Sequence, residues 1–198
     1  MYHDGNRKLQ KQFDSSALAD RLIEVTHHTS FTDYDKRFIE SSEFFFLATA
    51  DAEGRPDCSF KGGPRGFVRV TGETQLIFPD YDGNGMFKSL GNIEVNGAVG
   101  LLFITMGESP QRIRVNGRAS VLTHSERLAD FTGAQLLVQV EVEHIFPNCP
   151  RYIPDLSSNT PSPYTPRGDL DPIEPEWKEM DLFSDVVPER FDPKTLKD

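Results

Sequence analysis

The sequence has few cysteines and no long hydrophobic run, and both absences narrow the possible protein classes. Only Cys58 and Cys149 occur among 198 residues, so a disulfide framework is excluded and two reduced thiols are expected. No apolar run reaches the roughly 18 residues that a membrane span requires. The N-terminal segment MYHDGNRKLQKQFD also lacks the apolar core of a secretory signal. We therefore expect a cytoplasmic protein without a membrane partner.

Positive charge is also scarce. The chain has 21 basic and 31 acidic residues, which gives a formal net charge of −10. Such a chain repels the phosphate backbone, so no nucleic-acid partner is expected. His27 and His28 are adjacent and would point in different directions on a helix, so no metal site is expected there. The sequence contains none of the G-x-S-x-G, H-E-x-x-H or P-loop motifs.

Residues 1–42 are polar and show helical spacing. The segment SSALADRLIEVTHHTSF predicts a short amphipathic helix with Ser15 or Ser16 as its N-cap. The segment TDYDKRFIESS predicts a second helix, with Thr32 as N-cap and Asp35 completing a capping box. We expect both helices to pack on a sheet formed by the following residues.

Residues 43–153 form the strand-rich part of the chain. AVGLLFIT is apolar throughout, which predicts a strand covered on both faces. QRIRVNGRASVL and AQLLVQVEVEHIF alternate between apolar and polar residues, as half-buried strands do. Short, closely spaced strands favour a barrel over an alternating βαβ sheet. We predict a mostly β protein with flanking helices (α+β), built on a six-stranded antiparallel split β-barrel that one helix, from about residue 84 to 95, interrupts.

Residues 154–198 differ in composition from the rest. They hold eight of the 14 prolines and 11 acidic against five basic residues. Large apolar residues are spaced along the segment and could pack on a protein surface: Trp177, Leu182, Phe183 and Phe191. We predict an extended C-terminal arm that lies on its own domain or on a second subunit; disorder is the alternative that this composition also favours.

The stretch FPDYDGNGMFKSLGN, residues 78–92, indicates a binding site. A strand end leads into a glycine-rich turn, and a helix follows. Gly83 and Gly85 would let the backbone approach a ligand, and the amides of a helix N-terminus bind phosphate well. Asn84 could cap the helix, while Lys88 and Ser89 would add a charge and a hydroxyl donor. The alternative is an ordinary Asn-Gly turn beside a solvated lysine.

Two neighbouring segments carry further groups suited to a flat, partly anionic ligand. SFKGGPRGF places Lys61 before a glycine pair inside a predicted strand, where glycine often marks the close approach of a ligand or another backbone. Arg112, Arg114 and Arg118 recur on one face of a later strand. They would bind negative charge, or they are solvated or paired with acidic residues.

Three stretches together resemble a known family. FFFLATADAEGRPDCSFKGGPRGFVRV, LIFPDYDGNGMFKSLGNIEVNGAVGLLFI and RIRVNGRASV look like the pyridoxamine 5′-phosphate oxidase-like family of FMN-binding split barrels, over about residues 38–153. The resemblance implies a homodimer with FMN at the subunit interface. It also implies cofactor-binding positions along the second strand, in the glycine-rich turn, at the helix start and on a late strand: Ser59, Phe60, Lys61, Gly62, Asp80, Asn84, Lys88, Ser89 and Arg112.

The resemblance further implies an FMN-dependent oxidoreductase that passes electrons between the flavin and a small organic substrate or a nicotinamide cofactor. No catalytic side chain can be named. The alternatives are a non-catalytic flavin-binding protein, for sensing or storage, and a barrel dimer that serves protein interaction. The acidic arm stands where true pyridoxamine phosphate oxidases have an arginine-bearing strand, so pyridoxamine phosphate is not the expected substrate. We expect Cys58 to be buried and structural, with a redox-active thiol as the alternative.

Overall fold

The computed structural model describes residues 1–159, 162–163 and 173–188. The chain divides into two compact units, one of Met1–His27 with Ser162–Asp198 and one of His28–Pro161. Part of the predicted C-terminal arm, including Phe191, lies outside the described residues.

The smaller unit joins the N-terminal helices to the C-terminal segment. It contains α1 (Asp4–Gln12), α2 (Ser16–Thr26) and the short 3-10 helix η2 (Glu176–Lys178). The guanidinium of Arg21 on α2 donates to the Leu182 carbonyl oxygen at 2.6 Å and pairs with Asp185 at 3.2 Å. Helix α2 follows the predicted segment, whereas α1 was not anticipated because its apolar residues are few.

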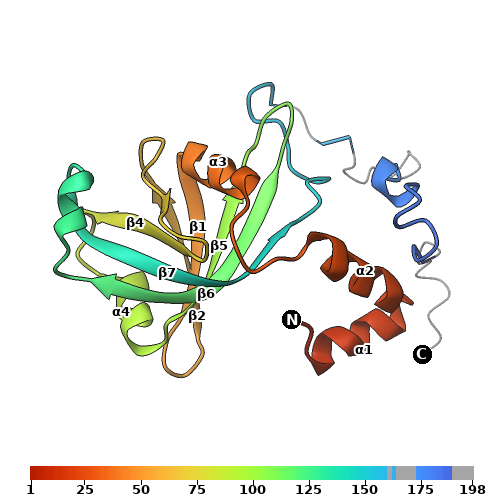
Figure 1. The fold of residues 1–198 in the computed structure, drawn as a ribbon, viewed down its shortest axis with the longest axis horizontal. Coiled ribbons are helices and arrows are strands. Elements are labelled where there is room, and N and C mark those ends of the chain that lie inside the picture. The colour runs from red at the N-terminus through yellow and green to blue at the C-terminus, as the bar shows by residue number, and fades with distance from the viewer. Residues whose placement is uncertain (160–161, 164–172, 189–198) are drawn as a thin grey trace. The chain divides into compact units, whose positions relative to one another are not determined.

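The larger unit is built on one antiparallel sheet of seven strands (Figure 1). The strands are β1 (Phe44–Ala50), β2 (Pro56–Gly62), β3 (Arg69–Val70), β4 (Gln75–Tyr81), β5 (Ala98–Ile104), β6 (Arg112–Leu122) and β7 (Ala134–Pro147). Their order across the sheet is β2-β1-β5-β6-β7-β4-β3. The predicted fold class is confirmed. The expected count of six strands is wrong by one, because the two-residue β3 pairs with β4, and the sheet remains open between β2 and β3.

Helices α3 (Asp33–Ser41) and α4 (Lys88–Val95) lie near opposite ends of the curved sheet (Figure 1). The capping box predicted for α3 is present, since Thr32 and Asp35 each accept a hydrogen bond from the other's backbone amide. Helix α4 begins four residues later than the predicted residue 84. The 3-10 helix η1 (Glu126–Asp130) connects β6 to β7, and Ser125 caps its start.

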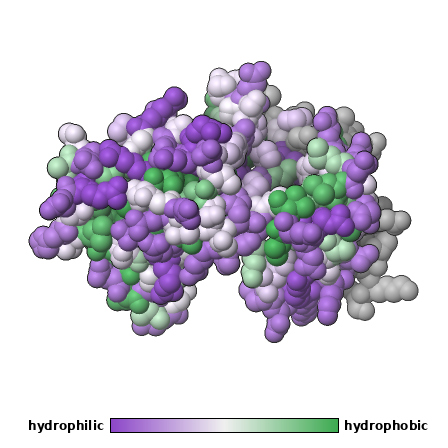
Figure 2. Space-filling view, in the orientation of Figure 1, coloured by the Kyte–Doolittle hydropathy of each residue, from purple (hydrophilic) through white to green (hydrophobic). Residues whose placement is uncertain are grey.

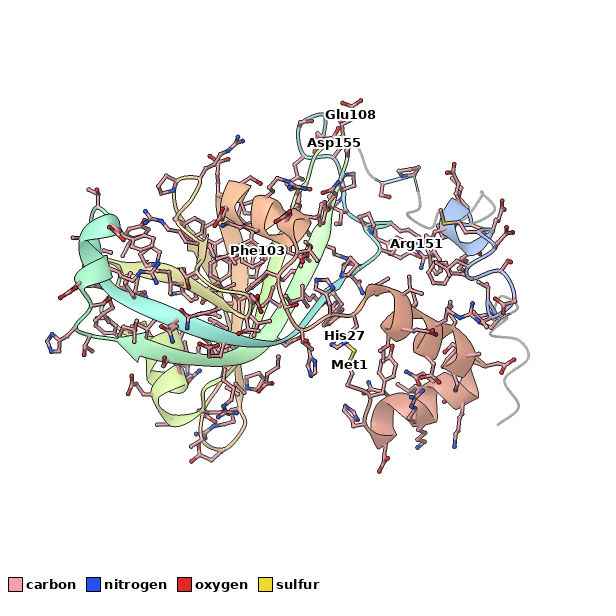
Figure 3. The ribbon with its side chains drawn as sticks, viewed as in Figure 1. Met1, His27, Phe103, Glu108, Arg151 and Asp155 are labelled. Atoms are coloured by element: carbon pink, nitrogen blue, oxygen red, sulfur yellow. The ribbon has the colours of Figure 1, made fainter. Side chains whose placement is uncertain are left out.

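Aromatic rings fill the centre of the sheet. Phe45 is fully buried, and its ring centroid lies 5.0 Å from those of Phe78 and Phe103 and 5.9 Å from that of Phe67. Figure 3 shows Phe103 inside the larger unit. Strands β6 and β7 alternate between buried and exposed positions as predicted. Burial of these rings contributes hydrophobic free energy that stabilises the folded sheet.

The outer face of β5 differs from the prediction. The strand was expected to be covered on both faces, but Ala98 is exposed, and Gly100 and Leu102 are half-buried. In the view of Figure 2, polar residues cover most of the visible surface, with hydrophobic residues in scattered patches. None of the helices in the described part of the chain has the length and apolar composition needed to span a bilayer.

A substitution at Gly117 tests how closely the backbones of β6 and β7 approach each other. The register shifts between Asn116 and Gly117, and a Cβ atom at Gly117 would lie 2.1 Å from the backbone oxygen of Glu141. We expect Gly117→Ala to lower the free energy of unfolding by about 1–3 kcal/mol, because the two backbones must move apart. Urea unfolding measures this, with Gly107→Ala as the control, since a Cβ atom at Gly107 meets nothing within 4 Å. Equal stability of the two variants would contradict the register.

Candidate functional site

A cleft of about 780 Å³ opens where β2 approaches the end of β4 and the start of α4. Cavities of this size hold small organic ligands. The lining residues come from β2, β4, the loop before α4, the first turn of α4 and the start of β7: Asp57, Cys58, Ser59, Phe60, Lys61, Asp80, Tyr81, Asp82, Gly83, Asn84, Gly85, Met86, Phe87, Lys88, Ser89, Leu90 and Gln135.

A small hydroxyl cluster joins β2 to α4 in this cleft. Because side chains alternate along a strand, Asp57, Ser59 and Lys61 share one face of β2. The Ser59 and Ser89 hydroxyl oxygens are 2.9 Å apart, and the Ser89 hydroxyl donates to the Asp57 carboxylate at 3.4 Å. Ser89 is buried. The cluster therefore places two hydroxyl groups next to the first turn of a helix.

A second polar group joins β2 to β4 and β7. The Lys61 ammonium lies 3.5 Å from Asp80 Oδ1, and the Gln135 amide donates to Asp80 Oδ2 at 3.1 Å. The side chains of Lys61 and Asp80 are 20% and 12% exposed, so water screens this pair only partly. The Asp80 carboxylate thus positions the Lys61 ammonium at the edge of β2.

The start of α4 leaves its backbone donors without a side-chain cap. Phe87 occupies the N-cap position with a left-handed backbone, φ 47°, and makes no capping hydrogen bond. This conformation costs free energy for a residue with a side chain. Asn84 does not cap the helix as predicted; its side chain accepts from the Met86 amide at 3.0 Å, inside the loop. The amides of the first turn therefore have no side-chain acceptor from the N-cap residue and could bind an anion.

Buried contacts fix α4 against the sheet. Leu90 and Ile93 belong to the hydrophobic core, and the Asn92 side-chain amide donates to the Thr49 hydroxyl on β1 at 2.9 Å. Both Asn92 and Thr49 are buried. The first turn of α4 is thereby placed relative to β1 and β2.

The cleft has a mixed charge. Asp57, Asp80 and Asp82 line it together with Lys61 and Lys88, so carboxylates outnumber ammonium groups by three to two. Because Lys61 pairs with Asp80, Lys88 is the cation that remains for a ligand in this part of the site. Lys88 is exposed, and no carboxylate of the described residues is ion-paired with it.

Two predicted positions, Gly62 and Arg112, are not among the lining residues. A Cβ atom at Gly62 would lie 2.8 Å from the ring of Phe60, which is itself 62% exposed. Arg112 lies on β6, three strands away from β2 in the sheet. The cleft brings together the other predicted positions: Ser59, Phe60, Lys61, Asp80, Asn84, Lys88 and Ser89.

Sequence reasoning missed two polar residues of the cleft. The period of two along β2 could have found Asp57, which shares a face with Ser59 and Lys61. No local signal marked Gln135, because it reaches Asp80 only through the pairing of β4 with β7. Cys58 is exposed and lines the cleft, so the expectation of a buried thiol is wrong. Within the described ranges, no group of three or more His, Cys, Asp or Glu side chains could hold a metal ion.

The sequence of the larger unit matches a known protein family. A family model described as pyridoxamine 5′-phosphate oxidase matches residues 31–155, which is more than half of the chain. The matched range includes the cleft residues and the whole seven-stranded sheet. No curated protein matches the chain.

Several solved structures are similar to the chain. HupZ of Group A Streptococcus is 21% identical; the match covers 67% of this chain and 98% of that one, with a TM-score of 0.48. An FMN-binding protein from Syntrophomonas wolfei is 15% identical over 72% of this chain and 93% of its own, with a TM-score of 0.42. HutZ, the haem storage protein of Vibrio cholerae, is 19% identical over 56% and 89%, with a TM-score of 0.41.

The hydrogen bond between Asn92 and Thr49 can be tested directly. We expect Thr49→Val to lower the free energy of unfolding by about 1–3 kcal/mol, because the buried Asn92 amide loses its acceptor. Adding Asn92→Leu to this variant should recover part of the loss, since neither polar group then remains. Urea unfolding of the single and double variants measures both effects. A Thr49→Val variant as stable as the parent would show that this bond does not position α4.

Proposed function

Because the chain belongs to the pyridoxamine 5′-phosphate oxidase family, we propose that it is an FMN-dependent oxidoreductase that acts as a homodimer. The observation that carries the proposal is the cleft in which an uncapped helix start, a lysine and two serine hydroxyls face one gap. The proposed substrate is a small organic molecule or a nicotinamide cofactor.

The donors at the start of α4 fit the phosphate of FMN. Helix amides and the N-terminal end of the helix dipole favour an anion. Lys88 supplies a full positive charge, and the hydroxyls of Ser59 and Ser89 can donate to phosphate oxygens. Asp57 opposes the anion, so binding depends on Lys88 and the helix start together. Gly85, with φ 71°, forms part of the loop beside them.

The edge of β2 fits the flat ring system. As the first strand of the sheet, β2 pairs only with β1, so one side of its backbone is available to a ligand. Ser59, Phe60, Lys61 and Gly62 are the positions that would line the ring. When bound, FMN supplies the electron or hydride transfer, which positive charge near its pyrimidine end favours. The chain itself binds and orients the groups.

The outer face of the sheet supports a homodimer. Phe44 and Phe60 stack with ring centroids 5.5 Å apart, and Phe46 meets Phe60 edge to face at 6.1 Å. Phe60 is 62% exposed. Its row continues across the sheet through Phe46 and Leu102 to Arg114. Exposed aromatic side chains next to one another are typical of an interaction surface, and a second copy is the proposed occupant.

The dimer also accounts for Arg112. Three strand spacings, about 14 Å, separate β6 from β2, and Arg112 is not among the residues that line the cleft of its own chain. We assign Arg112 to the flavin bound by the second copy. This arrangement gives each flavin site residues from both subunits.

The alternative function is a non-catalytic flavin-binding protein, which would bind the same cofactor but would not turn over a substrate. A storage or sensing protein would use the same cleft, because the same groups would bind the flavin. Reduction of a dye acceptor by NADH or NADPH with the FMN-loaded protein supports the oxidoreductase. A loaded protein that neither donor reduces would leave flavin storage as the function.

Lys88 should discriminate between FMN and riboflavin, which lacks the phosphate. We expect Lys88→Ala to weaken FMN binding roughly 10- to 100-fold, as for loss of a charge-assisted hydrogen bond. Riboflavin affinity should change little. Flavin fluorescence titration measures both constants.

Lys36→Ala is the matched control, because Lys36 is an exposed lysine on α3. Asp57→Asn should move FMN affinity in the opposite direction, since it removes the carboxylate next to Ser89. Equal losses for FMN and riboflavin in Lys88→Ala would place the phosphate elsewhere.

Phe60 tests the proposed subunit contact. We expect Phe60→Asp to shift the protein from dimer to monomer, because a charge would be buried against the second copy. Sedimentation velocity measures the oligomeric state. Val95→Asp is a matched control, as Val95 is also 62% exposed but lies at the end of α4. A dimer that survives Phe60→Asp would exclude this face.

A further inference from the structure

The sequence contains three asparagine residues that are each followed by glycine: Asn84, Asn96 and Asn116. In such a pair the glycine nitrogen can attack the side-chain amide of the asparagine and expel ammonia, because no Cβ atom on the glycine shields its backbone. Whether a given pair reacts depends on how firmly the fold holds the backbone and the side-chain amide. The three pairs lie in different surroundings, so the structure distinguishes them.

The first pair, Asn84 and Gly85, lies in the loop between β4 and α4, where both residues are exposed. The Asn84 Oδ1 atom accepts from the Met86 amide at 3.0 Å. This bond stabilises the negative charge that develops on Oδ1 when a nucleophile attacks the amide carbon. Among the described residues, neither the Asn84 side-chain nitrogen nor the Gly85 N–H has a hydrogen-bond partner. Neither the leaving group nor the nucleophile is therefore tied to this part of the chain.

The second pair has the same side-chain turn but is held at more points. The Asn96 Oδ1 atom accepts from the Ala98 amide at 3.2 Å, and its Nδ2 atom donates to the Asp51 carbonyl oxygen at 3.2 Å. The Gly97 carbonyl oxygen accepts from the Ala119 amide at 2.7 Å. Because the leaving nitrogen and the glycine backbone are both held, we expect Asn96 to keep its amide.

The third pair lies inside the sheet. Asn116 and Gly117 are on β6, which pairs with both β5 and β7. Gly117 is buried, and its backbone lies against that of Glu141. Attack requires the asparagine backbone to rotate out of its extended conformation, which the ladders on both sides prevent until the strand opens locally. Of the three pairs, the one at the cleft alone combines exposure with a leaving group that the described chain does not hold.

We propose that Asn84 is a site of spontaneous modification, and that its conversion to a carboxylate lowers the affinity of the cleft for an anionic ligand. The Gly85 nitrogen bonds to the Asn84 Cγ atom, and the bond between Cγ and the side-chain nitrogen breaks. That nitrogen leaves as ammonia with the Gly85 amide proton. Water then opens the resulting cyclic imide at either carbonyl, which gives aspartate or isoaspartate. No oxidant or reductant takes part.

Both products change the cleft in the same direction. Each adds a carboxylate to a lining that already holds three carboxylates and two ammonium groups. The new charge opposes the anion that Lys88 and the start of α4 would bind. Isoaspartate also lengthens the backbone of the loop that leads to the left-handed Phe87. The affinity part of the proposal rests on the proposed function, because FMN is the anion concerned.

The experiment is incubation of the flavin-free protein in mildly alkaline buffer, followed over time by peptide mass spectrometry. Loss of an amide changes the peptide mass, whereas rearrangement of Asp82, which also precedes a glycine, does not. We expect Asn84 to convert at least about tenfold faster than Asn96 and Asn116, because those two sites must open locally first. Asn84→Gln should abolish the conversion at this position, because the longer side chain would have to close a larger ring.

The functional effect is the FMN affinity of aged protein relative to fresh protein of the same variant, measured by flavin fluorescence. We expect the converted parent chain to lose affinity about 3- to 10-fold, and Asn84→Gln aged in the same way to show no loss. Fresh Asn84→Asp should bind FMN more weakly than fresh Asn84→Gln.

Equal conversion rates at Asn84 and Asn96 overturn the proposal. Complete conversion of Asn84 with unchanged FMN affinity also overturns it, because the modification would then have no effect on the cleft. Rapid conversion of Asn84 in a protein that never binds FMN refutes the flavin function and not the modification site.

Discussion

The structure depends on how the two ends of an open sheet meet. Strand β2 begins the sheet and β4 lies next to its last strand, yet side chains rather than a backbone ladder join them. The contact between Lys61 and Asp80 bridges this gap, and the hydroxyl pair of Ser59 and Ser89 joins β2 to α4. Because the ladder stops there, a polar cleft opens at the edge of β2, and the rings around Phe45 hold the curvature that brings the ends together.

Two regions that carry cationic side chains lie on different parts of the larger unit. One is at the start of α4, where Lys88 and the uncapped helix amides act together. The other is on β6, where Arg112 and Arg114 share the outer face. Three strands separate them within one chain. A second copy on the aromatic outer face would bring one region of each subunit near the other region of its partner, so the dimer and the cofactor site are parts of one proposal.

Local sequence patterns predicted the elements whose structure is decided locally. The capping box of α3 and the alternation of β6 and β7 follow from residues a few positions apart. The start of α4 was placed too early, because the Asn84 side chain accepts from the Met86 amide within the loop and does not cap a helix there. The glycine-rich turn, Lys61 and Ser89 line one cleft; their common site came from the family resemblance and not from a local pattern. Gln135 and the position of Arg112 depend on the order of strands in the sheet, which no local pattern encodes.

The most direct test of the cofactor site is a crystal structure of the protein grown with FMN. The account predicts the FMN phosphate against the first-turn amides of α4 and Lys88, the ring along the edge of β2, and Arg112 of a second copy at the pyrimidine end. An empty cleft in crystals grown with saturating FMN, or flavin bound elsewhere on the chain, would contradict it.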